Sequence, residues 1–455
     1  MMNFISVKKK DVYKEILLIA IPSILESLVI TFTSIIDSKM VSSLGIKAIA
    51  AISITYQPRL FILSVFLAID IVVPSLVAKY LGEDNRDICN EILNKALKIV
   101  VVLSIMFSIL SIIFARSILL AFANQPDTLN DSVMYFQIIM AGTVFNTIYM
   151  TINAAFVGSG KTNITFKSDS ISCIANIIFN YLLIDGRCGF PALGIKGAAI
   201  ATVIGYIMAM IYCLVALSNK NNYINVYYIT DGKTHINKHL YGEIALLAKS
   251  TFTDKIAQRI SLLVVGAIVA RIGSLQTAVY AVCMHLMNIN YAIGSGFQTA
   301  SVALVGRSYG AKNSDSIEMY NENIVELTLV IAIILSILMI ILRHWFINLF
   351  SYEEEFVRLG EISCIIIGFI AIFQSLKFAH IGCLQGLCDM KATMFISLVA
   401  FSVINLVLLA ILVLIMGKGI YGVWISTFVT QMIQCIMAYY YVKKDINNVR
   451  KEFAK

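Results

Sequence analysis

The stretch ILLIAIPSILESLVITFTSIID, residues 16–37, is long and apolar enough to cross a bilayer as a helix, and it ends on a carboxylate, Asp37. A charged side chain at the centre of a membrane helix costs roughly 2.5–3.5 kcal/mol on insertion scales. Such a side chain usually faces a cavity or a partner and often carries function. The sequence leaves two interpretations of Asp37, a functional group or a side chain that snorkels to the outer membrane interface.

The composition of the whole chain is typical of an integral membrane protein. Of its 455 residues, 59% are hydrophobic and 14% are charged, and the mean hydropathy is +0.84. A soluble domain needs more charge to cover its surface. We predict an all-α membrane protein with twelve transmembrane helices, at 14–40, 52–78, 94–121, 132–157, 164–184, 195–217, 244–271, 279–306, 320–347, 359–383, 393–417 and 420–442.

The two halves of the chain resemble each other at a constant offset. Gly45 and Gly273 are 228 positions apart, and so are Asn85 and Asn313. The same offset relates Ala50 to Ala278, Gly82 to Gly310, Gly158 to Gly386, Gly194 to Gly422 and Thr202 to Thr430. Each half then holds six spans. An even number brings the chain back to its starting side, so the repeat predicts two six-helix bundles related by a pseudo-two-fold axis along the membrane normal.

This repeat predicts the domain organisation. An N-terminal lobe covers 1–217, a cytoplasmic connection covers 218–243, and a C-terminal lobe with a short basic tail covers 244–455. Two similar bundles that face each other across a cleft suit alternating access by rocking.

The charge distribution predicts the orientation. Of the 35 lysines and arginines, 22 fall on one side of the predicted spans, 9 on the other and four within spans. The positive-inside rule then places both termini in the cytoplasm of a multi-pass plasma-membrane protein. This bias explains the net charge of +8, and no nucleic-acid partner is needed. The nine cysteines form no CxxC pair and the five histidines no HExxH motif, so we predict no bound cofactor.

Several motifs resemble the multidrug and toxic compound extrusion (MATE) transporters over nearly the whole chain. LGEDN at 81–85 and YGAKN at 309–313 close corresponding helices, and LQGLCDMK at 384–391 resembles a family turn with Cys388 in place of a glycine. The most specific motif is NIIFNYLLIDGRCGFPALGIKGAAIAT at 176–202, together with Pro22 fifteen residues before Asp37. The resemblance implies a monomeric transporter of drug-like small molecules in the lipid bilayer.

The chain also departs from the family pattern. One branch carries essential carboxylates in the seventh and tenth helices, where this chain has the neutral amides Gln258 and Gln374. The resemblance therefore implies no ion site of that kind in the C-terminal lobe. Asp254, one turn before Gln258, is a further candidate for a cleft in this lobe, although a structural role is the simpler interpretation.

Depth and spacing predict a polar site in the outer half of the N-terminal lobe. Asn176 and Asn180 share one face of their helix because they are four residues apart. Asp37 and Thr202 lie at a similar depth, and Asn153 is a further candidate. One carboxylate, two amides and a hydroxyl suit H+, Na+ or the cationic end of a substrate, and Asp37, Asn176, Asn180 and Thr202 are the candidate Na+ ligands.

Each of these residues also has a structural interpretation. The two asparagines are the kind of residue that joins membrane helices by hydrogen bonds, and Thr202 has its own i−4 carbonyl as an acceptor. Pro22 interrupts the hydrogen-bond ladder of its helix and serves either as a hinge or as a static kink.

The sequence favours a secondary-active exporter of lipophilic organic cations that exchanges them for H+ or Na+. The nearest alternative is a flippase for lipid-linked oligosaccharides or peptidoglycan precursors, which would use basic residues such as Arg259 and Lys377 to hold a pyrophosphate. A membrane-embedded enzyme is a distant alternative, because no histidine has a convincing catalytic partner. The roles of five further polar residues in the spans stay open: Asp70, Lys255, Arg259, Lys377 and His380.

Overall fold

A computed structural model describes residues 9–122, 126–227 and 238–454. Within these ranges the chain forms helices and turns and has no strand. Residues 228–237 of the predicted connection lie outside the described residues, as do the first eight residues and Lys455 of the two predicted lobes.

The order of helices confirms the predicted twelve-helix membrane fold. The first half contains α1 (Lys9–Ser42), α2 (Ile46–Gly82), α3 (Arg86–Ile113), α4 (Ala115–Phe122), α5 (Pro126–Gly158), α6 (Thr162–Leu183), the short 3₁₀ turn η1 (Arg187–Gly189) and α7 (Ile195–Leu217). The second half contains α9 (Lys238–Ile272), α10 (Ser274–Gly310), α11 (Ser314–Ile341), α12 (Arg343–Asn348), α13 (Glu354–Gly386), the continuous run of α14 (Met390–Ile396), η2 (Ser397–Ile404), α15 (Asn405–Leu409) and η3 (Ala410–Ile415), and finally α16 (Gly419–Phe453). In the described part of the chain, nine helices are long and apolar enough to cross a membrane by length and composition, and α6, α9 and α10 complete the set of twelve.

The internal repeat is visible in the helix boundaries. Helices α2 and α10, α3 and α11, and α5 and α13 begin and end 228 residues apart. The turns match as well. Asp84 and Lys312 each have a φ of 54°. The next residues, Asn85 and Asn313, accept a hydrogen bond from a backbone N–H in the following helix, at 3.1 Å and 2.9 Å. An asparagine in this position caps the helix by satisfying a backbone N–H that has no partner within the helix.

The described residues belong to two compact units. One is Met1–Ile24 with Lys249–Lys455, and the other is Leu25–Ala248. The first part of α1 therefore packs with helices of the second half, whereas the rest of α1 packs with the first half. The predicted boundaries at 217/218 and 243/244 follow the sequence repeat and stay a prediction, as does the pseudo-two-fold axis.

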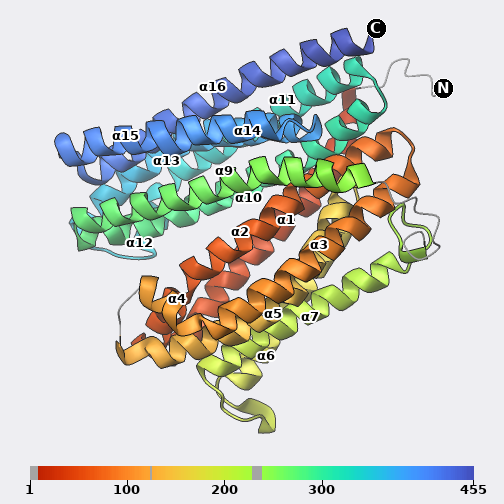
Figure 1. The fold of residues 1–455 in the computed structure, drawn as a ribbon. Helices are drawn as coiled ribbons and strands as arrows, with labels where there is room; N and C mark the ends of the chain where they lie inside the picture. The colour runs from red at the N-terminus through yellow and green to blue at the C-terminus, as the bar shows by residue number, and fades with distance from the viewer. Residues whose placement is uncertain (1–8, 123–125, 228–237, 455) are drawn as a thin grey trace. The chain divides into compact units, whose positions relative to one another are not determined.

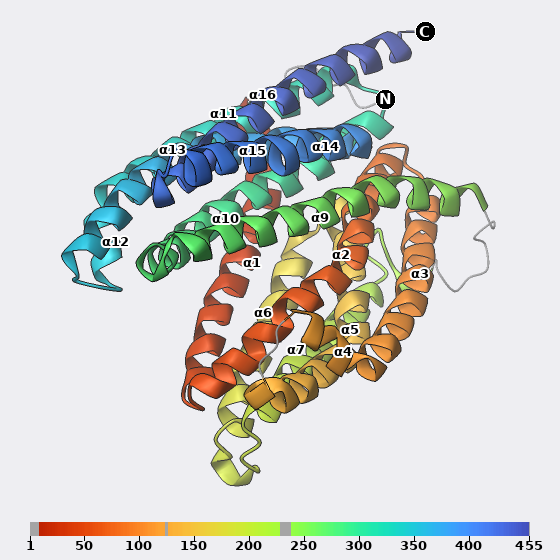
Figure 2. The same cartoon turned by 60° about the vertical axis from the view of Figure 1, so that its left-hand side comes forward.

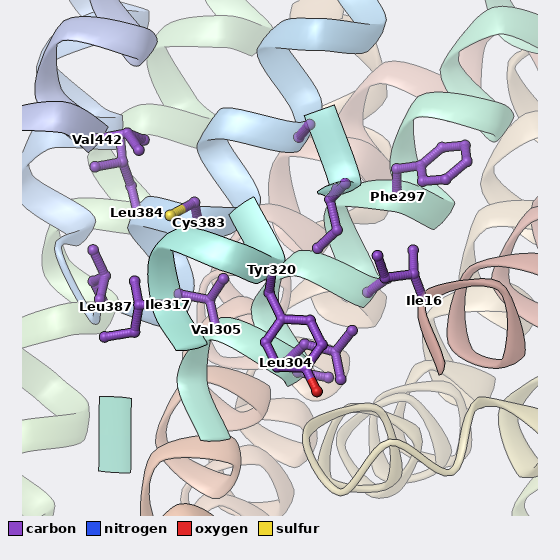
Figure 3. Close-up of a cluster of buried hydrophobic side chains, with 14 of the residues drawn as sticks. Ile16, Phe297, Leu304, Val305, Ile317, Tyr320, Cys383, Leu384, Leu387 and Val442 are labelled. Carbon is purple, nitrogen blue, oxygen red and sulfur yellow. The ribbon is translucent and has the colours of Figure 1, made fainter. Parts of the chain in front are cut away.

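The unit that contains Lys249–Lys455 has a core built from five helices (Figure 3). Ile16 from α1 lies against Phe297 and Leu304 from α10, and Cys383 from α13 and Val442 from α16 complete the cluster. All five side chains are buried. In Figures 1 and 2 the start of α1 and the end of α16 lie at the same end of this unit, which is the result an even number of spans requires.

The unit of Leu25–Ala248 is organised around α5, which packs against α2, α3 and α7 (Figure 2). Helix α7 also packs along α6, and the two approach closely where Gly205 faces the backbone oxygen of Ser172. The loop between them is held to the end of α6, because the N–H of Leu193 donates to the carbonyl of Leu183 at 2.9 Å. This loop sets α7 antiparallel to α6 and brings Thr202 opposite Asn176.

Candidate functional site

The Leu25–Ala248 unit contains a continuous chain of polar contacts, here called the Asp37 cluster and made of Asp37, Asn176, Asn180 and Thr202. The Nδ2 of Asn180 donates to the Oδ1 of Asp37 and, at 3.3 Å, to the Oδ1 of Asn176. The Nδ2 of Asn176 donates to the hydroxyl of Thr202 at 3.2 Å. The structure thus brings together the four residues that the sequence predicted at one depth, from α1, α6 and α7.

Burial of the Asp37 cluster increases from the carboxylate towards the amides. Asp37 is half-buried and Asn176 is 7% exposed, whereas Asn180 is completely buried. Asp37 contacts an amide within its own unit, so its contacts favour the functional interpretation over a side chain that only reaches the membrane interface. The hydroxyl of Thr202 also donates to the carbonyl of Ala198 at 3.0 Å, as the structural interpretation predicted.

One oxygen in the Asp37 cluster is buried without a hydrogen-bond partner. It is the Oδ1 of Asn180, the same side chain whose nitrogen binds Asp37. A buried acceptor that lacks a donor is costly. A carboxylate and a free amide oxygen on one site are hard oxygen ligands of the type that alkali and alkaline-earth cations use. The donor set therefore fits Na+, and Asp37 alone also fits H+.

The internal repeat separates scaffold from site. Thr430, the repeat mate of Thr202, donates to Asn405 at 3.3 Å, so a threonine–asparagine pair recurs in the second half. The mates of Asp37 and Asn180 are Val265 and Leu408. The threonine–asparagine contact is thus part of the shared helix packing, whereas the carboxylate and the buried amide are additions that only the first half carries.

Asn153 lies in a different group of contacts. Its Nδ2 donates to the hydroxyl of Ser168 at 2.8 Å, and its Oδ1 accepts from the thiol of Cys213 at 3.3 Å. Among the described residues no hydrogen bond joins it to Asp37 or to either of the other asparagines. Asn153 thus links α5, α6 and α7, and the structure does not bring it into the Asp37 cluster.

The candidate residues of the C-terminal lobe make internal contacts. Gln258 donates to Asp254 at 2.8 Å and to Ser397 at 2.9 Å. Gln374 accepts from the buried Asn290 through its side-chain oxygen. These amides satisfy neighbouring polar groups, as polar residues between membrane helices commonly do. Their participation in a cleft stays a prediction.

The structure reveals one charged residue near Asp37 that the sequence reasoning did not single out. Arg59, on α2, donates from its guanidinium to the hydroxyl of Tyr206 on α7. Its charge acts electrostatically on Asp37 and on Tyr135. A lone arginine inside an apolar span is the signal that could have found it, since charged residues at membrane depth usually face the bundle interior.

A second carboxyl pair lies towards the other end of the same helices. Glu26 accepts from the hydroxyl of Thr165 at 2.7 Å and also forms a hydrogen bond with Asp169. The repeat mates of these two acids are Asp254 and Ser397, which Gln258 joins. A polar contact at this place is therefore shared by both halves.

The polar residues left open by the sequence have individual surroundings. Asp70 accepts from Thr151 at 2.9 Å, and its other carboxylate oxygen is buried without a partner. Lys255 lies 3.9 Å from Asp254. The amine of Lys377 lies 4.4 Å from the ring centre of Phe378, and His380 packs edge-on against Tyr439. No contact of this kind is described for Arg259, so its role stays open.

Pro22 is buried inside α1, which continues as a helix on both sides of it. Its missing N–H removes one hydrogen bond from the ladder of the helix. The two compact units divide α1 between Ile24 and Leu25, less than one turn later. The hinge interpretation stays a prediction, and this division places the weakened turn where it would act.

Fold and site together define a multi-pass α-helical membrane protein that is built from two repeated halves and carries a polar cluster in the first of them. The chain belongs to the MatE family, whose profile matches residues 22–182 and again residues 252–411. The second match follows the first by about the length of the repeat.

Individual relatives cover almost the whole chain. It is 23% identical over 431 residues to the "Probable multidrug resistance protein NorM" of Halalkalibacterium halodurans, covering 93% of this chain and 92% of that protein. It is 29% identical over 194 residues to the FAD transporter of Shewanella oneidensis, covering 42% of each chain. The fold is similar to the crystal structure of MATE in the bent conformation, with a TM-score of 0.89, 17% identity and 98% of both chains covered.

Proposed function

We propose that this protein is a secondary-active exporter of organic compounds in the plasma membrane, driven by the inward movement of H+ or Na+. The main support is the hydrogen-bonded chain from Asp37 to Thr202, because it offers a carboxylate and a buried free amide oxygen inside a membrane lobe. Both termini are cytoplasmic in this proposal, the protein acts as a monomer, and no cofactor is required. Relatives named as multidrug resistance proteins support the substrate class.

In the proposed mechanism the incoming cation competes for the hydrogen bonds of Asp37. When H+ or Na+ neutralises the carboxylate, its bond with Asn180 weakens, and the buried amide oxygen becomes a ligand or an acceptor. The change at Asp37 bends α1 near Pro22 and expels the substrate from the lobe. A potential of 100 mV supplies about 2.3 kcal/mol per charge, which supports roughly a fifty-fold gradient for one coupled charge.

Efflux from proteoliposomes tests this proposal. Purified protein is reconstituted with a fluorescent cationic dye, and dye movement is followed under imposed pH and sodium gradients, separately and together. We expect Asp37→Asn to abolish gradient-driven movement, whereas Asp185→Asn, the same change at an exposed carboxylate, leaves it intact. Gradient-driven export by Asp37→Asn at the wild-type rate would refute the assignment of Asp37.

A further inference from the structure

Arg59 is a charged residue whose guanidinium has no acidic partner. Among the described residues no carboxylate lies within 4.0 Å of it, and its one described hydrogen bond goes to the hydroxyl of Tyr206. A guanidinium has five N–H donors arranged as a planar fork that matches the oxygens of carboxylates and phosphates. Most of its donor capacity is therefore available to a ligand. Arg59 is half-buried, so part of its surface is accessible.

Aromatic rings surround this guanidinium. It lies 6.0 Å from the ring centre of Tyr206, and that ring stacks on Tyr149 with centres 6.3 Å apart and planes 30° from parallel. Tyr56 and Tyr135 also lie within electrostatic range of it. Tyr149 and Tyr206 are half-buried. Stacked rings beside a cation are a surface on which another flat aromatic group can lie.

The repeat shows that the fold does not require this charge. The repeat mate of Arg59 is Met287, a buried apolar residue, and the mate of Asp37 is Val265. The first half thus carries one carboxylate and one guanidinium at positions where the second half is apolar. The two charges act on each other and on the same tyrosine, Tyr135, so they belong to one region of the lobe.

We propose that Arg59, Tyr149 and Tyr206 form an anion-recognising subsite, and that the exported compounds include zwitterionic aromatic molecules. The anionic oxygens bind Arg59, the flat ring lies against Tyr149 and Tyr206, and the cationic group lies at Asp37. This inference rests on the proposed export function. It names the substrate class more narrowly than a lipophilic cation does, because a simple cation leaves the charge of Arg59 without a partner. Incoming H+ or Na+ then displaces the cationic end of the substrate from Asp37 while the anionic end stays bound.

Binding of two matched dyes to the purified full-length protein tests the subsite without any ion gradient. Rhodamine B has a cationic ring system and a free carboxylate, and its methyl ester keeps the cation and lacks the anion. We expect wild-type protein to bind rhodamine B at least about tenfold more tightly than the ester, since hydrogen bonds to charged groups contribute roughly 1.5–3 kcal/mol. Equal affinity of the wild type for both dyes would overturn the proposal.

Variants assign that preference to the guanidinium. Arg59→Met, which installs the residue found at the repeat mate, should weaken rhodamine B binding by about 10- to 150-fold and ester binding by less than about twofold. Arg59→Lys keeps the charge but loses the fork and should give an intermediate value. Arg187→Met, at an exposed arginine, is the matched control and should change neither affinity. Equal weakening of both dyes by Arg59→Met would show a structural role for Arg59 and reject the subsite.

The dye test and the efflux test fail separately. If dye binding depends on Arg59 but no gradient drives efflux, the subsite stands and the export proposal fails. If gradient-driven efflux of the ester depends on Asp37 but the dyes bind equally, export stands and the subsite fails.

Discussion

Gly205 sets the distance between α6 and α7 one turn from Thr202, and its replacement by alanine should disturb the Asp37 cluster from a distance. A methyl group at this position would lie 2.8 Å from the backbone oxygen of Ser172 and 3.5 Å from the Cβ of Asn176. An ordinary contact begins at 3.4 Å, so the two helices must separate by about 0.6 Å. That movement lengthens the 3.2 Å hydrogen bond between Asn176 and Thr202 to about 3.8 Å, which no longer counts as a hydrogen bond.

The energetic cost of Gly205→Ala has two parts. Overpacking of a close contact typically costs about 1–3 kcal/mol, and loss of the hydrogen bond costs about 0.5–1.5 kcal/mol. With a shift of about 2–4 °C per kcal/mol for a unit of this size, the unfolding temperature should fall by at least about 3 °C. Thermal unfolding of the purified protein in detergent measures this shift, and proteoliposome efflux measures the loss of transport.

Gly266→Ala is the matched control for this prediction. Gly266 lies inside α9, and a methyl group there meets no atom within 4 Å. Alanine is the better helix former, so this variant should be as stable as the wild type or slightly more stable. If Gly205→Ala unfolds at the same temperature as Gly266→Ala and transports normally, the close packing of α6 and α7 does not hold the cluster in place.

Three further predictions concern single residues. Asn85→Ala removes the side-chain acceptor for the N–H of Ile88 and should lower stability by about 1 kcal/mol, with a similar loss for Asn313→Ala; a shift in the thermal unfolding of only one of the two would contradict the equivalence of the caps. Thr430→Ala breaks the scaffold contact with Asn405 and should lower the unfolding temperature while leaving the ion dependence of efflux unchanged. Pro22→Ala restores a helix hydrogen bond, so it should raise stability and slow gradient-driven efflux; efflux at the wild-type rate would favour a static kink.

The fold could be predicted from the sequence because its main determinants are local or periodic. Apolar stretches of bilayer length located all twelve helices, and the offset of 228 residues reappears in the helix boundaries. The turn at Cys388 shows the same strength: this residue adopts a φ of 61° where its repeat mate Gly160 has 74°, so the backbone shape persists despite the substitution. The division of α1 after Ile24 could not be predicted, because it depends on which helices pack together in three dimensions.

The candidate site could be predicted in part. Depth along each helix and the i, i+4 spacing brought Asp37, Asn176, Asn180 and Thr202 to one level, and these residues are in contact. Depth alone does not fix the direction in which a side chain points around its helix. Asn153 therefore looked equivalent in the sequence, although it contacts Ser168 and Cys213 instead.

Arg59 was missed for a related reason. Its importance comes from rings on α5 and α7 that are 90 and 147 residues away in the sequence, and no local pattern links them to it. The repeat itself carried more information than motif reading drew from it. Positions where one half has a charge and the other an apolar residue, such as Asp37 with Val265, separate the site from the scaffold.

Substrate exchange by Asp37→Asn, compared with substrate accumulation, tests the coupling role of Asp37 most directly. Proteoliposomes with equal substrate on both sides report exchange without a gradient, and vesicles with an imposed pH or sodium gradient report uphill movement. If Asp37 is the group that the driving cation binds, the variant should still exchange labelled substrate but should fail to concentrate it under any gradient. Uphill accumulation by the variant at the wild-type level would contradict the coupling scheme.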